Sequence, residues 1–339
     1  MAERVLSQRE LNRATLARQL LLKRARLPVV RAVERVAGLQ AQLASTPYVG
    51  LWSRLEGFRP EALERALLRG AAARGLLMRG TVHLVTTPDY GLFGTALDVT
   101  SPTWITPEIE ELAVLVTPSL RAFCSEPRTR DEVVGWLERE HRVTPDGTNR
   151  VWYAVRLRAR IAHAPETSLW RAPIHGPSFV AVADGNLSGD AARRELVRRY
   201  LAAFGPATRA EIAGWSGLKV RDFADRLDGL RRLRDDRGRE LLDLPRAPLP
   251  AADTPAPVRF LPKFDNVLLD RQRVLPEEYR KLVVRKNADV QPTFTVDGLV
   301  AGSWSFRRGR VTTEPFAPLP RTGKRELEDE ASRLAAWLS

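Results

Sequence analysis

The chain has 339 residues, of which 54 are Lys or Arg and 41 are Asp or Glu, giving a formal net charge of +13. This balance favours a polyanionic partner, either nucleic acid or an anionic membrane. No stretch approaches the roughly 20 apolar residues of a membrane-spanning helix, and the N-terminus has no signal-peptide core. The single cysteine, Cys124, excludes an internal disulfide and a cysteine-rich zinc site. We therefore expect a cytoplasmic protein, at the nucleoid when bound to DNA.

The basic residues are unevenly divided, since only six of the 54 are lysine. Arginine offers a planar fork of donors that suits phosphate groups and guanine edges. Codon bias in a GC-rich genome accounts equally well for the ratio of Arg to Lys. It does not account for the net charge, because such genomes raise acidic residues as readily as arginine.

An internal repeat is the most informative pattern, because residues 127–136 and 206–215 are identical at six of ten positions. Each copy places a threonine three residues before a glutamate, as in a capping box at the start of a helix. In the second copy we expect a short helix, a turn at Ser216-Gly217 and a longer helix from about Lys219 to Leu233. Short helix, turn and second helix form a helix-turn-helix, and residues 234–244 suit a hairpin wing.

Basic side chains decorate the second helix of each copy. Lys219, Arg221 and Arg226 lie on the helix expected at 219–233, and Arg156 and Arg160 on a helix expected at 149–160. We interpret these five residues as DNA contacts. Strands near 168–170 and 179–182 would form the wing of the first copy.

The N-terminal third has the features of a divergent third unit. Ser7 and Glu10 form another capping box, further helices begin at Pro28 and Pro60, and residues 75–85 alternate like a hairpin. Beyond a Pro-rich connector, residues 294–300 form a hairpin with a type I′ turn signal, and a final helix spans about 323–338. The sequence thus predicts an α+β fold of three tandem winged-helix units (1–90, 91–185, 186–250) and a β-rich C-terminal region with a final helix (251–339).

Common catalytic and cofactor motifs are missing from the sequence, and the four histidines are scattered, so we expect no metal and no cofactor. One local feature is Gln40-Ala41-Gln42, which holds two of the six glutamines of the chain. Residues two apart face different sides of a regular helix. Both glutamines can face one ligand only if the helix ends or distorts, which Gly38 makes easy. The alternative is that this pair is exposed surface at the end of the second helix.

Five segments together resemble the winged-helix DNA glycosylase family typified by an azinomycin-resistance glycosylase and a bacterial crosslink-repair relative. They are Gln40-Ala41-Gln42 and residues 78–85, 206–211, 260–266 and 296–304. The likeness runs over essentially the whole chain. It implies three winged-helix units around a basic channel, with Gln40 and Gln42 facing it as the catalytic pair. The repair relative carries a carboxylate at the second position, so Gln42 places this chain with the self-resistance type.

The resemblance further implies a monofunctional glycosylase that hydrolyses the N-glycosidic bond of N7-alkylated purines, including bulky adducts or interstrand crosslinks. The expected partner is double-stranded DNA, bound by a monomer. Arg79 and His83 on the first hairpin, and Lys263, are further candidate DNA contacts; for His83 a structural role is the alternative. The residues alone are also compatible with a second function, that of a non-catalytic winged-helix DNA-binding protein or transcription regulator.

Overall fold

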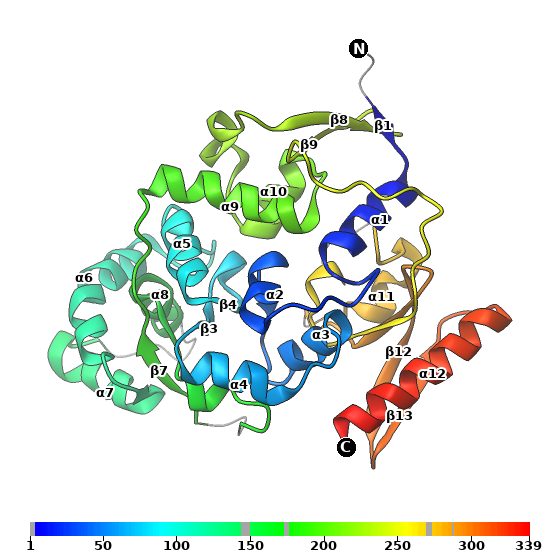
Figure 1. Cartoon of the computed structure of the whole chain (residues 1–339). Coiled ribbons are helices and arrows are strands. Elements are labelled where there is room, and N and C mark those ends of the chain that lie inside the picture. Colours follow the sequence, from blue (N-terminus) through cyan, green and yellow to red (C-terminus); the bar gives the residue numbers. More distant parts are fainter. Residues whose placement is uncertain (1–3, 144–149, 173–175, 269–272, 287) are drawn as a thin grey trace.

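The computed structural model describes residues 4–143, 150–172, 176–268, 273–286 and 288–339, without the side chain of Arg226 (Figure 1). Helices and sheets are mixed along the whole chain, which confirms the predicted combination of α and β structure. Figure 1 shows α6 (Pro107–Phe123) and α7 (Arg130–His141) at one side of the molecule. Strands β12 (Leu299–Arg307) and β13 (Arg310–Pro315) lie with α12 (Arg321–Leu338) at the other side.

One order of elements recurs within the described residues: a helix, a short strand, two further helical segments, and a hairpin whose second strand pairs with the short strand. The first occurrence comprises α2 (Val29–Arg35), β2 (Leu39–Gln40), α3 (Thr46–Arg54), α4 (Pro60–Leu68), β3 (Ala72–Leu76) and β4 (Val82–Thr86). Strand β2 pairs with β4, and the 3-10 turn η1 (Met78–Gly80) connects the two strands of the hairpin. The hairpin predicted at 75–85 is thereby confirmed.

The second and third occurrences follow the same order. The second is α6, β5 (Arg128–Thr129), α7, α8 (Arg150–Ala159), β6 (Ile161–His163) and β7 (Ser178–Ala181), and β5 pairs with β7. The third is α9 (Gly189–Phe204), a bridge from Ala207 to Leu242, α10 (Arg209–Ser216), β8 (Arg231–Asp235) and β9 (Glu240–Asp243), with the two 3-10 turns η3 (Val220–Asp222) and η4 (Ala224–Arg226) together in the place of the second helical segment. The capping boxes predicted at Thr129 and Thr208 are present.

The first two occurrences share one sheet of order β2-β4-β3-β6-β7-β5. The seam lies between β3 and β6, where Arg74 is paired with His163 and Gly75 with Ala162. Helix α5 (Thr87–Leu97) connects them and packs against α9. The third hairpin instead pairs with β1 (Val5–Leu6), which leads through the predicted capping box at Ser7 into α1 (Gln8–Arg18).

The C-terminal region is a four-stranded antiparallel sheet, β10 (Arg259–Leu261), β11 (Thr293–Val296), β12 and β13, with α12 packed against it. The insertion between β10 and β11 holds η5 (Asn266–Leu268), η6 (Glu277–Tyr279) and α11 (Arg280–Val283). Asp297 and Gly298 both have positive φ angles, as the predicted type I′ turn requires. On α12, Leu327 and Leu334 are buried, and α12 covers the final helix predicted at about 323–338.

Two predicted elements are wrong. The helix expected from Lys219 to Leu233 is replaced by η3, η4 and strand β8, because residues 231–235 pair with both β9 and β1. Gly229, with a φ of +72°, separates the turns from the strand. The strand expected near 168–170 is also absent, since residues 165–168 form the 3-10 turn η2 (Pro165–Ser168) and β6 supplies the hairpin strand instead.

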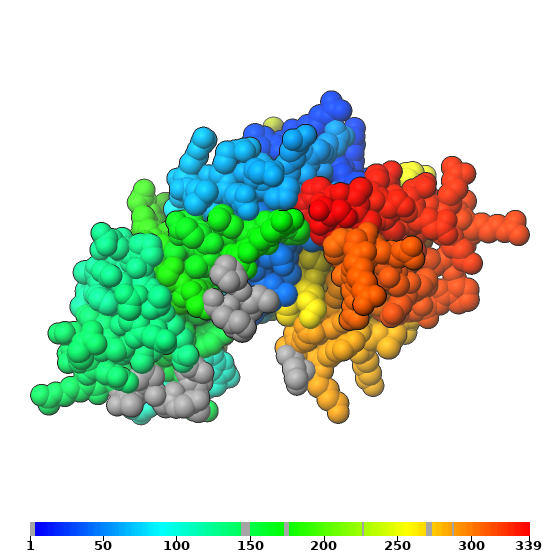
Figure 2. Space-filling model, turned by 90° about the horizontal axis from the view of Figure 1, so that it is seen from below, coloured from blue at the N-terminus to red at the C-terminus, as the bar shows by residue number. Residues whose placement is uncertain are grey.

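A cleft separates the two sides of the molecule (Figure 2). Cyan and green segments form one wall, and orange and red C-terminal segments form the other. Blue N-terminal and yellow segments lie at its floor.

Candidate active site

A glycine turn places the glutamine pair. Helix α2 ends at Arg35, and Gly38 then turns the chain with a φ of +82°. A Cβ on Gly38 would lie 2.5 Å from Val85 Cγ1 and 2.9 Å from the carbonyl oxygen of Leu84. Only glycine fits this approach, which brings Gln40 into register with His83 on β4. The helix does end before the pair, so the expectation of exposed helix surface is wrong for Gln40, which is 7% exposed at the end of a strand.

The outer edge of β2 is held by a side chain rather than by another strand. Asn266 donates from Nδ2 to the carbonyl oxygen of Gly38 at 2.8 Å, and its Oδ1 accepts from the backbone N–H of Gln40 at 3.0 Å. The neighbouring Asp265 makes two 2.8 Å contacts with Arg54 of α3, and both side chains are fully buried. Residues 265 and 266 therefore fix both the strand that carries Gln40 and the helix that follows it.

Arg79 connects the side chain of Gln40 to the third repeat. Its Nη2 donates to Gln40 Oε1 at 3.3 Å, and its Nη1 donates to the carbonyl oxygen of Trp215 in the last turn of α10. A cation is favourable at a helix C-terminus, where carbonyl groups are unsatisfied. Burial lowers the pKa of Arg79 to about 10, so it is still protonated at neutral pH. The carboxamide oxygen of Gln40 is thus already engaged by a positive charge.

The glutamine motif occupies a junction that differs from the equivalent junctions of the other two repeats. There the short strand or bridge runs straight into a helix capped by Thr129 or Thr208. Here five residues, 41–45, separate the end of β2 from the start of α3, and the N-cap residue Ser45 makes no side-chain capping bond. Gln42 lies in this inserted loop.

A pocket of about 430 Å³ opens beside the inserted loop. Its lining comes from the loop, the β3–β6 seam, α8 and the segment after β6: Gln42, Leu43, Ala44, Ser45, Arg74, Val82, Arg156, His163, Thr167, Trp170, Ala172 and Pro177. Gln42 is half-buried, and its side-chain amide has no hydrogen-bond partner among the described residues. Its carbonyl oxygen accepts from Arg74 Nη2 at 3.4 Å. The pocket therefore presents an uncommitted carboxamide beside buried positive charge.

His83 lies behind the glutamine pair, fully buried. Burial, with a contribution from the nearby Arg79, lowers the pKa of His83 to about 3, so the ring is neutral at physiological pH. Its Nδ1 lies 2.9 Å from the carbonyl oxygen of Thr81, and Nε2 has no partner. These surroundings fit the structural alternative for His83 and leave it no surface to offer DNA.

The other predicted DNA contacts are scattered. Lys219, which precedes η3, and Arg221, within it, are exposed, whereas Lys263 is paired with Asp289 at 2.8 Å. The side chain of Arg226 lies outside the described residues. Arg156 lines the pocket beside Gln42.

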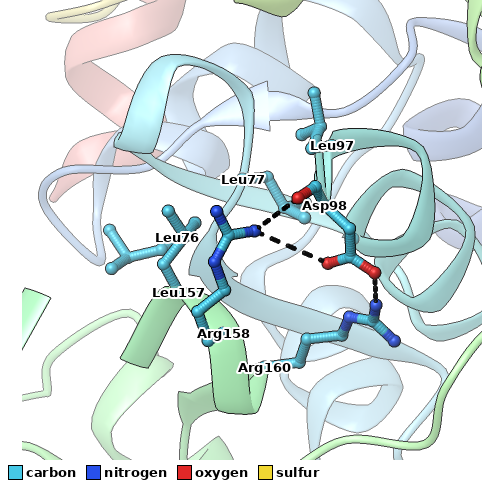
Figure 3. A pocket seen from close by; sticks show the side chains of 8 residues that line it. Leu76, Leu77, Leu97, Asp98, Leu157, Arg158 and Arg160 are labelled. Atoms are coloured by element: carbon cyan, nitrogen blue, oxygen red, sulfur yellow. Dashed lines mark hydrogen bonds and ion pairs between the residues drawn. The ribbon is translucent and has the colours of Figure 1, made fainter. Parts of the chain in front are cut away.

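Arg160 lies in a closed ion-pair cluster. It forms ion pairs with Asp98 and Asp184, and Arg158 joins the same cluster through the carbonyl oxygen of Asp98 at 2.8 Å. Figure 3 shows Arg158 and Arg160 converging on Asp98 beside Leu76, Leu77 and Leu157. The guanidinium of Arg160 is therefore committed within the protein.

Three site residues were missed by the sequence analysis: Asn266, Arg74 and His163. Arg74 had a readable signal, because it is the one charged residue of the segment Ala72-Ala73-Arg74-Gly75-Leu76, a strand buried throughout. Asn266 belongs to a polar pair that interrupts an apolar run, but its partners lie more than 220 residues away.

Within the described ranges, no group of three or more His, Cys, Asp or Glu side chains is placed to hold a metal ion. Among the described helices none is long and apolar enough to cross a membrane.

Comparisons with known proteins agree over nearly the full length. An interstrand DNA cross-link repair glycosylase of Streptomyces sahachiroi is 28% identical over 355 residues, covering 94% of this chain and 93% of that protein. The solved structure of the Streptomyces sahachiroi DNA glycosylase AlkZ superposes with a TM-score of 0.83 at 23% identity, over 98% of this chain and 96% of the other, which shows the same fold. A family profile described as DNA glycosylase AlkZ-like matches residues 33–337. The chain therefore belongs to the AlkZ-like DNA glycosylase family.

Proposed function

We propose that this protein is a monofunctional DNA glycosylase that hydrolyses the N-glycosidic bond of N7-alkylated purines in duplex DNA, bulky adducts and interstrand crosslinks included. The observation that carries the proposal is the uncommitted Gln42 amide at the rim of a basic pocket, next to the anchored Gln40. The name of the Streptomyces sahachiroi relative, an interstrand DNA cross-link repair glycosylase, supports the choice of substrate class.

Hydrolysis of this bond does not require a protein carboxylic acid as proton donor, which fits a pocket whose described lining contains no Asp or Glu. Alkylation at N7 puts a positive charge on the base, so the base is already a good leaving group. Cleavage of the glycosidic bond passes through an oxocarbenium-like sugar, as in glycoside hydrolysis. A carboxamide oxygen stabilises this cation and positions the attacking water.

The two glutamines differ in whether their side-chain amides already take part in hydrogen bonds. The oxygen of Gln40 accepts from Arg79, so this residue serves to hold the site together. Gln42 has both amide atoms available among the described residues, so we assign water positioning and cation stabilisation to Gln42. No lysine is among the described residues that line the pocket, so a Schiff-base lyase step is not part of the proposal, and an abasic site is the expected product.

We further propose that the three repeats are winged-helix units, at 1–90, 91–185 and 186–250, and that they act as walls around a damaged base in a monomer. The recurring order of helix, strand, two helical segments and hairpin supports this interpretation. The short turns η3 and η4 in place of a second helix leave the third unit without a helix to read the major groove. Its exposed Lys219 and Arg221 suit phosphate contacts instead.

The test is incubation with duplexes that carry N7-methylguanine or a defined N7–N7 crosslink, followed by hot alkali to cleave abasic sites. We expect strand cleavage by the wild type and a loss of about 10²-fold in the single-turnover rate for Gln42→Ala. No base release from either substrate, with binding intact, would favour the non-catalytic DNA-binding alternative. Release that is unaffected by Gln42→Ala would keep the enzyme and remove Gln42 from its mechanism.

A further inference from the structure

The pocket beside Gln42 contains a buried arginine that hydrolysis of the glycosidic bond does not use. Arg156 of α8 is 6% exposed, and its guanidinium lies over the rings of Phe179 and Trp152, with Cζ at 4.4 and 5.3 Å from the ring centroids. Its Nη2 contacts His163 Nε2 at 3.4 Å, while its buried Nε has no partner. The aromatic rings hold the guanidinium in place and leave most of its donors unused.

Arg74 brings a second positive charge to the same pocket. It is 7% exposed and donates only to backbone carbonyl oxygens, those of Ala41 at 2.9 Å, Thr167 at 3.2 Å and Gln42 at 3.4 Å. Neither Arg74 nor Arg156 has a carboxylate at ion-pair distance among the described residues. Burial lowers the pKa of both arginines to about 10, so both are charged at neutral pH.

The remaining polar group cannot balance these charges. Burial, with both arginines adding to it, lowers the pKa of His163 far below its usual range, so the ring is neutral and not an anion. Since Arg156 can only donate, His163 Nε2 is the acceptor and the proton resides on Nδ1. Two buried cations without a counter-charge are costly unless a ligand supplies negative charge.

Two parts of a DNA substrate could enter the pocket, the alkylated base and a phosphodiester group, and the positive charge of the pocket decides between them. An N7-alkylated purine is itself a cation, and the pocket would repel it. A phosphodiester is an anion with several acceptor oxygens, which suit the fork of an arginine. The pocket therefore favours the backbone of the strand over the damaged base.

We propose that Arg156 and Arg74 form the binding site for one phosphodiester group of the damaged strand, immediately beside the amide of Gln42. The group bound there holds the neighbouring sugar at a fixed position relative to Gln42, while the base lies outside this pocket in the cleft. The assignment of the damaged strand rests on the proposed function; the phosphodiester site itself does not.

The test is a chemical double-mutant cycle read out by binding. Duplexes with a tetrahydrofuran abasic analogue carry a single neutral methylphosphonate at each phosphate around the analogue in turn. Dissociation constants are measured for the wild type, Arg156→Gln, Arg156→Lys and the control Arg310→Gln, which removes an exposed charge from the first residue of β13. Thermal melting confirms that each variant is folded.

We expect one methylphosphonate position to weaken wild-type binding about tenfold or more, as for loss of a charge-assisted hydrogen bond. In Arg156→Gln this penalty should fall below about twofold, whereas Arg310→Gln should keep it in full and Arg156→Lys should keep most of it. If the wild type shows no sensitive position, or if the penalty survives Arg156→Gln at every position, the phosphodiester site is wrong.

Two further measurements distinguish a phosphodiester site from a site for free phosphate, and the failure of this proposal from the failure of the proposed function. Inorganic phosphate is titrated against wild type and Arg156→Gln by thermal melting. Stabilisation that needs Arg156, together with duplexes that are insensitive to methylphosphonate, would mean that the site takes a free anion and would overturn the proposal. The excision assay on N7-methylguanine is run in parallel: absent excision with the expected binding pattern removes the proposed function and leaves the phosphodiester site standing.

Discussion

The carboxamide oxygen of Asn266 accepts a hydrogen bond from the backbone N–H of Gln40 at 3.0 Å, although the two residues are 226 positions apart. The same side chain donates to Gly38 on the far side of Leu39. Asn266 thus takes the place of a neighbouring strand along the outer edge of β2. The C-terminal region is thereby part of the candidate site.

Asn266→Ala tests this contact. It leaves a buried N–H and a buried carbonyl group unsatisfied, so we expect the free energy of unfolding to fall by about 1–3 kcal/mol and excision to slow. The matched control is Asn12→Ala, because Asn12 is also buried and donates to the carbonyl oxygens of Arg273 and Gly298, away from the pocket. Urea unfolding should show a loss for both variants, and saturating single-turnover excision a loss for Asn266→Ala alone. Equal excision rates would mean that Asn266 supports only stability.

The two glutamines should separate in their effects. We expect Gln42→Ala to lower the excision rate by about 10²-fold with little change in stability, since its amide has no partner to lose among the described residues. Gln40→Ala removes the acceptor of Arg79 Nη2 and should lower stability as well as rate. Unfolding midpoints and single-turnover rates, measured together, distinguish the two roles. A larger stability loss for Gln42→Ala than for Gln40→Ala would reverse the assignment.

His83 predicts a dependence of stability on pH. Its folded pKa, about 3, lies below the ordinary value of 6.5, so the unfolded chain binds the extra proton between these values. The stability from neutral His83 is fully present above pH 6.5 and is lost as the pH falls towards 3, by about 1.4 kcal/mol per pH unit. In His83→Leu, the free energy of unfolding between pH 6 and 4.5 should therefore fall less steeply, by about one proton. His141→Leu is the control, because that ring is only half-buried, on α7. An unchanged slope in His83→Leu would show that the ring is protonated in the fold.

Salt dependence distinguishes exposed basic residues from one held in a close ion pair, since Arg221 lies 4.0 Å from Asp222 and Lys263 only 2.8 Å from Asp289. Each phosphate neutralised contributes a slope of about −0.9 to a plot of log affinity against log salt concentration. We expect the double variant Lys219→Gln, Arg221→Gln to flatten this slope by about 1–2, because both side chains are exposed. Lys263→Gln should change the slope little, since Lys263 is already paired with Asp289. Fluorescence anisotropy of a labelled duplex between 50 and 300 mM NaCl, about the usual working range, gives both slopes. Equal slopes in the three proteins would exclude η3 from the DNA contact surface.

The sequence predicts the local parts of this structure well. The capping boxes at Thr129 and Thr208 and the turn at Asp297-Gly298 depend on residues within a few positions of one another, and all are present. The segment 219–233 shows where such reasoning fails. Its apolar spacing suits a helix, but residues 231–235 find strand partners in β9 and in β1 at the other end of the chain.

The candidate site divides in the same way. An end of the helix before Gln40, eased by Gly38, was predicted only as the condition for both glutamines to face one ligand, beside the alternative of exposed helix surface. The pocket was not, because Arg74 and His163 come together only where β3 meets β6, and Arg156 reaches them from α8. The hairpins β3–β4 and β6–β7 are each formed by residues close in sequence, and nothing in the sequence indicates that β3 pairs with β6.

The inserted loop at 41–45 has a consequence for how this protein tolerates change. In the second and third repeats the residue that ends the short strand or bridge segment also caps the next helix, so Thr129 and Thr208 cannot be replaced without loosening α7 and α10. In the first repeat the loop separates Gln40, the last residue of β2, from the start of α3, so Gln40 does not cap that helix. Side chains on the loop can therefore be replaced without loss of a helix cap, while Thr129 and Thr208 keep the helices of the other two repeats capped. Substitutions in the loop at 41–45 can therefore change the pocket, and substitutions at Thr129 or Thr208 the stability of the fold, each without the other.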